Sequence, residues 1–237
     1  MPTTISDAAL NAALDVLTGI ELEFDIFDAR MPDLECYCEE CAAEAWDSEQ
    51  FTYQNYGLLG GGVPSGWEPG TDEAAECRTD GPTALRAQYD LLTRFVDWVE
   101  GAFDDIGMGA GHSCHVHVNV SPHVGPAVSV QHITDAWFEM RDEAYTLVAH
   151  DGRLQSAWCR PLHSGDQLRA SKGQELVLNS VGSVELRLFD ATTDVDLLHR
   201  RMDFVQRWVA CALQREWAAA AYDAAKRAAA VAVHSMT

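Results

Sequence analysis

GAGHSCHVHVNVS, residues 109–121, carries apolar and polar side chains at alternate positions. Three valines alternate with three polar residues: Val116, Val118 and Val120 with His115, His117 and Asn119. A period of two is typical of a β-strand with one buried face and one polar face. A solvated strand face usually carries lysine, threonine, glutamate or serine. Two imidazoles and an amide in their place suggest metal ligands, another kind of active site, or a merely polar surface.

Two further stretches repeat this design. GIELEFDIF (19–27) places Glu21 and Glu23 on one face, and SVELRLFDA (183–191) places Glu185 opposite a row of apolar residues. An antiparallel sheet can leave one face in water, so a single strand of this kind indicates little about function. Three such strands predict a sheet face that collects ionisable side chains for a chemical purpose.

The residue types on this face favour phosphoryl chemistry. Carboxylates are hard oxygen ligands that suit Mg²⁺ or Mn²⁺. Arg187, which follows Glu185 on the same face, suits recognition of a phosphate or a carboxylate. The chain has no GxxxxGK[ST] phosphate-binding loop. These features together predict a nucleotide-dependent reaction assisted by a metal.

A second interpretation takes His115 and His117 as an H-x-H site for zinc or iron. The residues that would complete known H-x-H patterns are absent, because Asn119 and Val120 follow the second histidine where a metallohydrolase carries aspartate and histidine. A transition-metal hydrolase nevertheless stays open as an alternative function.

The whole chain predicts one domain of the α+β class, residues 1–237, with several antiparallel strands and about four helices. Helices are expected over 5–17, 82–105, 130–149 and from 194 to the end, with further strands over 71–81 and 175–180. Within this domain, residues 28–70 predict an irregular insertion and residues 212–237 an alanine-rich C-terminal helix that would lie loose or pack against a partner subunit in a homo-oligomer.

The composition is strongly acidic. The 237 residues include 37 acids and 16 lysines and arginines, which gives a net charge of −21. This charge excludes nonspecific binding to nucleic acids and to anionic membranes as expected functions. In about 1 M salt the Debye length is only about 3 Å, so repulsion among the negative charges is largely screened. The acidic composition therefore also predicts a protein from a salt-loving organism or from a virus of one. The chain shows neither a signal peptide nor an apolar run of membrane-spanning length, so a cytoplasmic location is expected.

Three cysteines form a compact motif in the insertion. Cys36, Cys38 and Cys41 have the spacing C-x-C-x₂-C, which supplies three of the four ligands of a structural zinc site. Cys77, a histidine or a cysteine of a partner chain would supply the fourth. The alternative is three unlinked thiols, and no disulfide framework is expected in a cytoplasmic protein.

Four motifs together resemble the amidoligase family, which comprises small members of the glutamine synthetase and glutamate–cysteine ligase superfamily. The motifs are, in chain order, GIELEFD, TDEAAEC, CHVHVNV and LNSVGSVELRLFDATTDVDLLHRRMDFVQRWV. The resemblance implies an antiparallel sheet shaped as a partial barrel, with helices packed on its outer face and with ATP and Mg²⁺ or Mn²⁺ on its concave face. It also implies an ATP-dependent carboxylate–amine ligase, which forms an amide or isopeptide bond through an acyl phosphate.

The resemblance assigns roles to particular residues. As metal ligands it implies Glu21, Glu23, Glu76 and Glu185, with Asp72 as a less close match. As catalytic residues it implies Arg187, Glu185 and His117, and as nucleotide-binding residues His115, Lys172, Asn179 and Arg160. The substrates would be a small or peptide carboxylate and an amine.

The chain also departs from the family pattern. Many relatives carry D-G-S before the acid of the second motif, where this chain has Asp72, Glu73 and Ala74. This departure leaves open a non-catalytic relative that binds an amino acid or a peptide, or a viral accessory protein.

Overall fold

A computed structural model describes residues 4–27, 63–69, 75–102, 105–107, 112–157, 159–163, 168 and 173–234. The elements in chain order are α1 (Asp7–Ala13), β1 (Leu17–Phe27), β2 (Trp67–Pro69), β3 (Ala75–Thr79), β4 (Thr83–Ala84), α4 (Leu85–Ala102), β5 (Asp105–Gly107), β6 (Ser113–Asn119), α5 (Val130–Tyr145), the 3₁₀ helix η1 (Asp151–Gln155), β7 (Cys159–Arg160), β8 (Gly173–Gln174), β9 (Leu176–Leu178), β10 (Ser183–Asp190) and α6 (Val195–His234).

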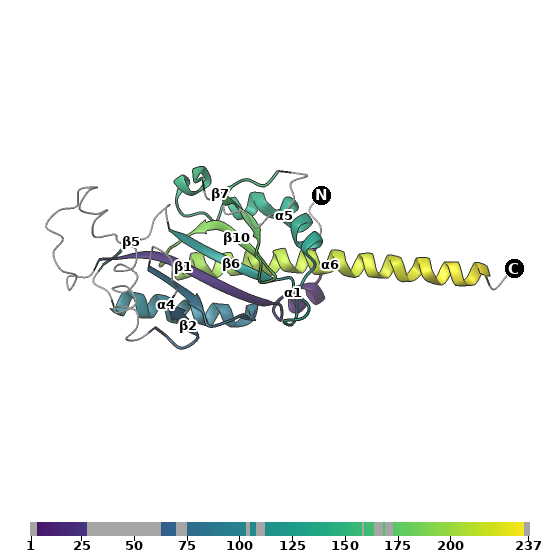
Figure 1. Cartoon of the computed structure of the whole chain (residues 1–237), viewed down its shortest axis with the longest axis horizontal. Coiled ribbons are helices and arrows are strands. Elements are labelled where there is room, and N and C mark those ends of the chain that lie inside the picture. Colours follow the sequence, from purple (N-terminus) through teal and green to yellow (C-terminus); the bar gives the residue numbers. More distant parts are fainter. Residues whose placement is uncertain are drawn as a thin grey trace.

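One antiparallel sheet organises the molecule (Figure 1). Its strands run in the order β2-β3-β1-β6-β10-β9, with β4 and β5 paired to opposite ends of β1. The α+β class and the antiparallel sheet are therefore confirmed. The described strands do not close into a barrel, because β2 and β9 form the two ends of this order and do not pair with each other. The finer, glutamine synthetase-like shape stays a prediction.

The expected alternation is present in the three central strands. The apolar residues of β1 and β6, among them Ile20, Leu22, Val116 and Val118, are buried in the core. Helix α4 covers this face, where the ring of Phe95 contacts Phe24 of β1. Helix α5 and the first half of α6 cover the rest of this face with their apolar side chains, as the helical spacing of those side chains predicts.

Strand β10 departs from simple alternation through a β-bulge. Leu186 pairs with Val116 and Phe189 pairs with Cys114, so β10 contains one more residue than β6 between these two pairs. The extra residue lets both Leu188 and Phe189 enter the core. Bulges turn side chains into new directions and are common next to active sites. Here the bulge includes Arg187.

Several predicted boundaries are wrong. The helix expected over 5–17 ends at Ala13, with Leu17 already in β1, and the helix expected over 82–105 spans Leu85–Ala102, with Asp105 in β5. Residues 28–70 are predicted to be irregular, but Trp67–Pro69 form edge strand β2, which pairs with β3. The indole N–H of Trp67 donates to the carbonyl oxygen of Leu91, so tertiary packing fixes a segment whose turn-rich composition gives no strand signal. Helix α5 ends at Tyr145 rather than near residue 149, because Asp190 accepts a hydrogen bond from the backbone N–H of Ala149.

The predicted C-terminal helix is confirmed as a single helix of 40 residues, α6. Its first half is buried against the sheet, whereas the side chains of residues 217–228 are exposed. Figure 1 shows the second half of α6 extending away from the rest of the molecule. No helix in the described part of the chain has both the length and the apolar character needed to cross a bilayer.

A buried ion pair joins β10 to α6. The side chains of Asp190 and Arg201 are both fully buried, and Arg201 donates to a carboxylate oxygen of Asp190 at 2.6 Å. Burial alone would raise the pKa of Asp190, but the N–H of Ala149, the charge of Arg201 and His150 together lower it. Asp190 is therefore an ionised structural residue.

We predict that Asp190→Ala lowers the free energy of unfolding by about 3–5 kcal/mol, because it leaves the buried Arg201 charge without its carboxylate. The exposed Asp97→Ala change removes the same charge and serves as the matched control, with an expected effect within about 0.5 kcal/mol. Urea unfolding followed by circular dichroism measures both. Equal stability of the two variants would show that the Asp190 pair contributes nothing net.

Candidate functional site

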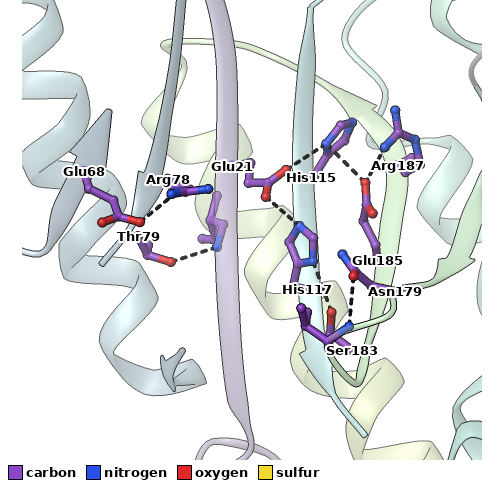
Figure 2. Close-up of polar contacts among 12 residues, drawn as sticks. Glu21, Glu68, Arg78, Thr79, His115, His117, Asn179, Ser183, Glu185 and Arg187 are labelled. Carbon is purple, nitrogen blue, oxygen red and sulfur yellow. Dashed lines mark hydrogen bonds and ion pairs between the residues drawn. The ribbon is translucent and has the colours of Figure 1, made fainter. Parts of the chain in front are cut away.

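The polar face of the sheet carries a continuous row of ionisable side chains from four strands (Figure 2). The row comprises Glu76 and Arg78 of β3, Glu21 and Glu23 of β1, His115 and His117 of β6, and Glu185 and Arg187 of β10. The register sets Glu21 opposite both Arg78 and His115, and Glu185 opposite His117. The strand pairing thus brings together residues that are far apart in the sequence.

Much of this row is shielded from water. Glu185 and Arg187 are only 7% and 8% exposed, and His115 is 3% exposed. A solvated sheet face would leave such side chains open, so the interpretation of a merely polar surface does not fit. Charged groups in a shielded position must compensate one another or bind a ligand.

Glu21 lies at the centre of the contacts. One of its carboxylate oxygens is 3.3 Å from Nδ1 of His115, and the other is 3.2 Å from Nε2 of His117. Nδ1 of His115 is also 3.3 Å from Glu185, whose same oxygen accepts a hydrogen bond from Arg187. The chain Glu21, His115, Glu185 and Arg187 is therefore one connected network.

The electrostatics of the pair formed by Glu21 and His117 favour charge on both. Burial would raise the pKa of Glu21, but hydrogen bonds and charges from His115 and His117 hold it well below its usual range. Burial would lower the pKa of His117, but the hydrogen bond and charge of Glu21 and the charge of Glu185 raise it instead. Glu21 is accordingly an ionised carboxylate between two imidazoles.

Three side chains fit a divalent cation. Single ligand atoms of Glu21, His117 and Glu185 all lie within 4.8 Å of one another, and no other such group exists among the described residues. Two carboxylates and an imidazole suit Mg²⁺, Mn²⁺ or zinc. Nε2 of His115 is buried and has no hydrogen-bond partner in the described part of the chain, which leaves a second imidazole nitrogen available beside them.

The structure separates the other two predicted metal carboxylates from this group. Glu23 and Glu76 pair with each other across β1 and β3, two residues further along than Glu21. An oxygen of Glu23 accepts a hydrogen bond from the backbone N–H of Ser113 at 3.0 Å. Neither carboxylate belongs to the group formed by Glu21, His117 and Glu185.

The predicted nucleotide-binding residues outside the network have structural contacts. The carboxamide oxygen of Asn179 accepts from the N–H of Val181 in the turn between β9 and β10. Nε of Arg160 donates to the carbonyl oxygen of Gly173 and so connects β7 to β8. These contacts place both residues in the framework of the fold.

Several predicted residues lie outside the described part of the chain: Lys172, Asp72, Cys36, Cys38 and Cys41. The zinc site therefore stays a prediction. Cys77, one suggested fourth ligand, pairs with Leu22 on the apolar face of the sheet, and burial raises the pKa of its thiol to about 12. Its thiol is thus a core group of low reactivity.

Sequence reasoning missed two residues that support the network. Arg153 of η1 is almost fully buried and donates to the carbonyl oxygen of Arg187 at 2.6 Å and to the hydroxyl of Ser113 at 2.9 Å. It therefore holds the bulge that presents Arg187. Ser183 lies with its hydroxyl 3.3 Å from Nδ1 of His117. Neither residue belongs to a charged i, i+2 pair, so the sequence pattern gives no signal for either.

No protein-family model matches the chain, and a search of curated proteins found no significant match. The geometry of the polar face and the four sequence motifs therefore supply the evidence on function.

We predict that Glu21→Gln lowers the pKa of His117, because it removes one of the two carboxylates that oppose the effect of burial. Glu143→Gln, at an exposed position of α5, is the control and leaves the pKa of His117 unchanged. Since the wild-type pKa is raised, the stability from this pair is fully present below about pH 6.5 and is lost as the pH rises through the folded value. Imidazole NMR titration of metal-free protein measures the pKa, and a higher value in Glu21→Gln would contradict the assignment.

We also predict that the chain binds Mn²⁺ at Glu21, His117 and Glu185. Glu185→Gln removes a ligand, so the affinity falls by more than the roughly 10- to 100-fold typical of losing an outer partner. Glu143→Gln retains the wild-type affinity. Electron paramagnetic resonance of free Mn²⁺ measures both, and equal affinity of the two variants would place the ion elsewhere.

Proposed function

We propose that the protein is an ATP- and divalent metal-dependent carboxylate–amine ligase. The observation that carries this proposal is the convergence of Glu21 and Glu185, from two strands that are not neighbours, beside the guanidinium of Arg187. Such an arrangement suits a transferring phosphoryl group, whose negative charge needs fixed cations. The order of the four sequence motifs supports the same class of reaction.

The residues present fit the metal that this reaction requires. Glu21, His117 and Glu185 would hold it, and they offer two oxygen ligands and one nitrogen ligand. When bound, the ion would neutralise negative charge on the phosphate oxygens.

The protein side chains would contribute orientation and charge. Arg187 is fixed by Glu185 at its guanidinium and by Arg153 at its carbonyl oxygen, so its position is defined before a substrate arrives. Preorganised cations of this kind stabilise developing charge without the cost of reorganisation. His115 contacts both Glu21 and Glu185 and so links the two carboxylates. The substrate carboxylate would receive the γ-phosphoryl group of ATP, and attack of the amine on the acyl phosphate would release phosphate.

A metal-dependent hydrolase is the second candidate. The observation that favours it is the presence of His117 in the group that could hold a metal, because imidazole is a preferred ligand of zinc. A hydrolase of this kind would need no ATP, and this requirement separates the two proposals.

We predict release of ADP and phosphate that depends on both a carboxylate and an amine when the protein is incubated with ATP, Mg²⁺ and pools of amino acids or peptides. Arg187→Ala reduces this rate by about 100- to 1,000-fold, because a fixed cation beside the phosphoryl group is lost. Arg94→Ala, on the exposed side of α4, is the control and retains the rate.

Arg187→Lys keeps a positive charge at this position. It shows whether the loss of ADP and phosphate release in Arg187→Ala comes from the missing charge or from unfolding. The ligase is supported if the lysine variant melts like the wild type and retains part of the activity. Absence of ATP binding in both low and molar KCl would contradict the ligase, and hydrolysis of amide or ester substrates without ATP would favour the hydrolase.

A further inference from the structure

A pocket of about 250 Å³ lies directly beside the network. It begins at Glu21 and His117 and continues over Gly19 toward the turns that follow β3, β6 and β9. Pockets for drug-sized ligands have volumes of about 300–1,000 Å³. This pocket is smaller, so it suits a short molecule or one end of a longer one.

Gly19 leaves the floor of the pocket open. It lies on the same face of β1 as Glu21, two residues earlier, where any other residue would point a side chain into the pocket. Its backbone does not require glycine, because Gly19 is not among the described glycines with a positive φ. A Cβ at this position would lie 3.5 Å from the hydroxyl of Thr79 and 3.8 Å from Cβ of His117, which are ordinary contacts. Alanine would therefore fit, whereas a larger side chain would fill the pocket.

The outer walls are apolar and fixed in place. Val124 and Val181 line the pocket although they are 54% and 74% exposed. The loop that carries Val124 is held by Asn119, whose amide donates to the carbonyl oxygens of Ser121 and Pro126 at 3.1 and 3.0 Å. Asn119 therefore shapes the pocket wall, and an apolar ligand would cover valines that otherwise face water.

Hydrogen-bond donors of a guanidinium lie at the end of the pocket where β3 pairs with Glu21. Arg78 lies there, with Nε bonded to Glu68 at 2.7 Å and with four more N–H groups on its terminal nitrogens. The hydroxyl of Ser183 lies on the opposite side of the pocket, beside His117, because Ser183 is on β10 and pairs with Asn119. Among the described lining residues Glu21 is the only acid, in a chain with a net charge of −21. The remaining N–H groups of Arg78 can donate to an anionic group on the ligand.

We propose that this pocket binds a short aliphatic carboxylate, with the carboxyl group beside Arg78 and the aliphatic chain extending toward Val124 and Val181. Gly19 then determines the size of the ligand that the pocket accepts. The proposal rests on the proposed function in one respect, since it makes this ligand the acid substrate of the ligase. The same chemistry is presented by a free acid and by the C-terminus of a peptide.

Binding is tested by saturation-transfer NMR and calorimetry on the full chain with Mg²⁺ and without ATP. The probes are hexanoate, a tripeptide with a C-terminal valine, and hexylamine as the probe of opposite charge. Wild type and Gly19→Ala bind a carboxylate probe with similar affinity. Gly19→Leu weakens binding by about tenfold or more, because its side chain overfills the pocket. Arg78→Gln also weakens binding of the carboxylates. The carboxylate probe that binds more tightly shows whether the ligand is a free acid or the C-terminus of a peptide.

Mn²⁺ affinity and the thermal midpoint serve as controls, and both stay at the wild-type values in Gly19→Leu. The proposal is overturned if no carboxylate probe binds, if Gly19→Leu binds as tightly as Gly19→Ala, or if hexylamine binds better than hexanoate. Because no ATP is present, these results do not depend on catalysis. ATP turnover that persists in Gly19→Leu would reject the pocket as the acid site and leave the ligase intact.

Discussion

The carboxylate of Glu21, shared between His115 and His117, is the interaction on which the site depends. Burial of an ionised carboxylate is unfavourable unless hydrogen bonds and opposite charge compensate it. Both compensating imidazoles come from β6, and β6 is held in register by β1 on one side and β10 on the other. A slip of one residue would turn the histidines to the other face of the sheet. The charge compensation of Glu21 therefore depends directly on the register of the sheet.

The sequence predicts a large part of this arrangement. Alternation in β1, β6 and β10 predicts the strands and the face on which Glu21, His117 and Glu185 lie, because strand periodicity is a local property. It does not predict which carboxylates meet. Glu21 and Glu23 share a face, and only the register with β3 and β6 places Glu21 with the histidines and Glu23 opposite Glu76.

Features that arise from tertiary packing were beyond prediction. The bulge of β10 is defined only relative to its partner strand, so the sequence SVELRLFDA reads as regular alternation. Arg153 reaches Arg187 across 34 residues from a segment with no strand or helix signal. The role of Gly19 cannot be predicted from the sequence either, because the missing side chain matters only once the walls of the pocket are known. The amide of Asn119, in contrast, is visible in the sequence, but its role as an anchor of a loop is not.

Helix α6 has a consequence for the behaviour of the molecule in solution. A helix of 40 residues is about 60 Å long, whereas a compact domain of 237 residues has a radius of gyration of about 18 Å. Since roughly the last half of α6 extends beyond the sheet (Figure 1), the chain has more friction than a sphere of equal mass. A single chain will consequently sediment slowly and elute early from a sizing column. Its oligomeric state must be read from light scattering rather than from elution volume.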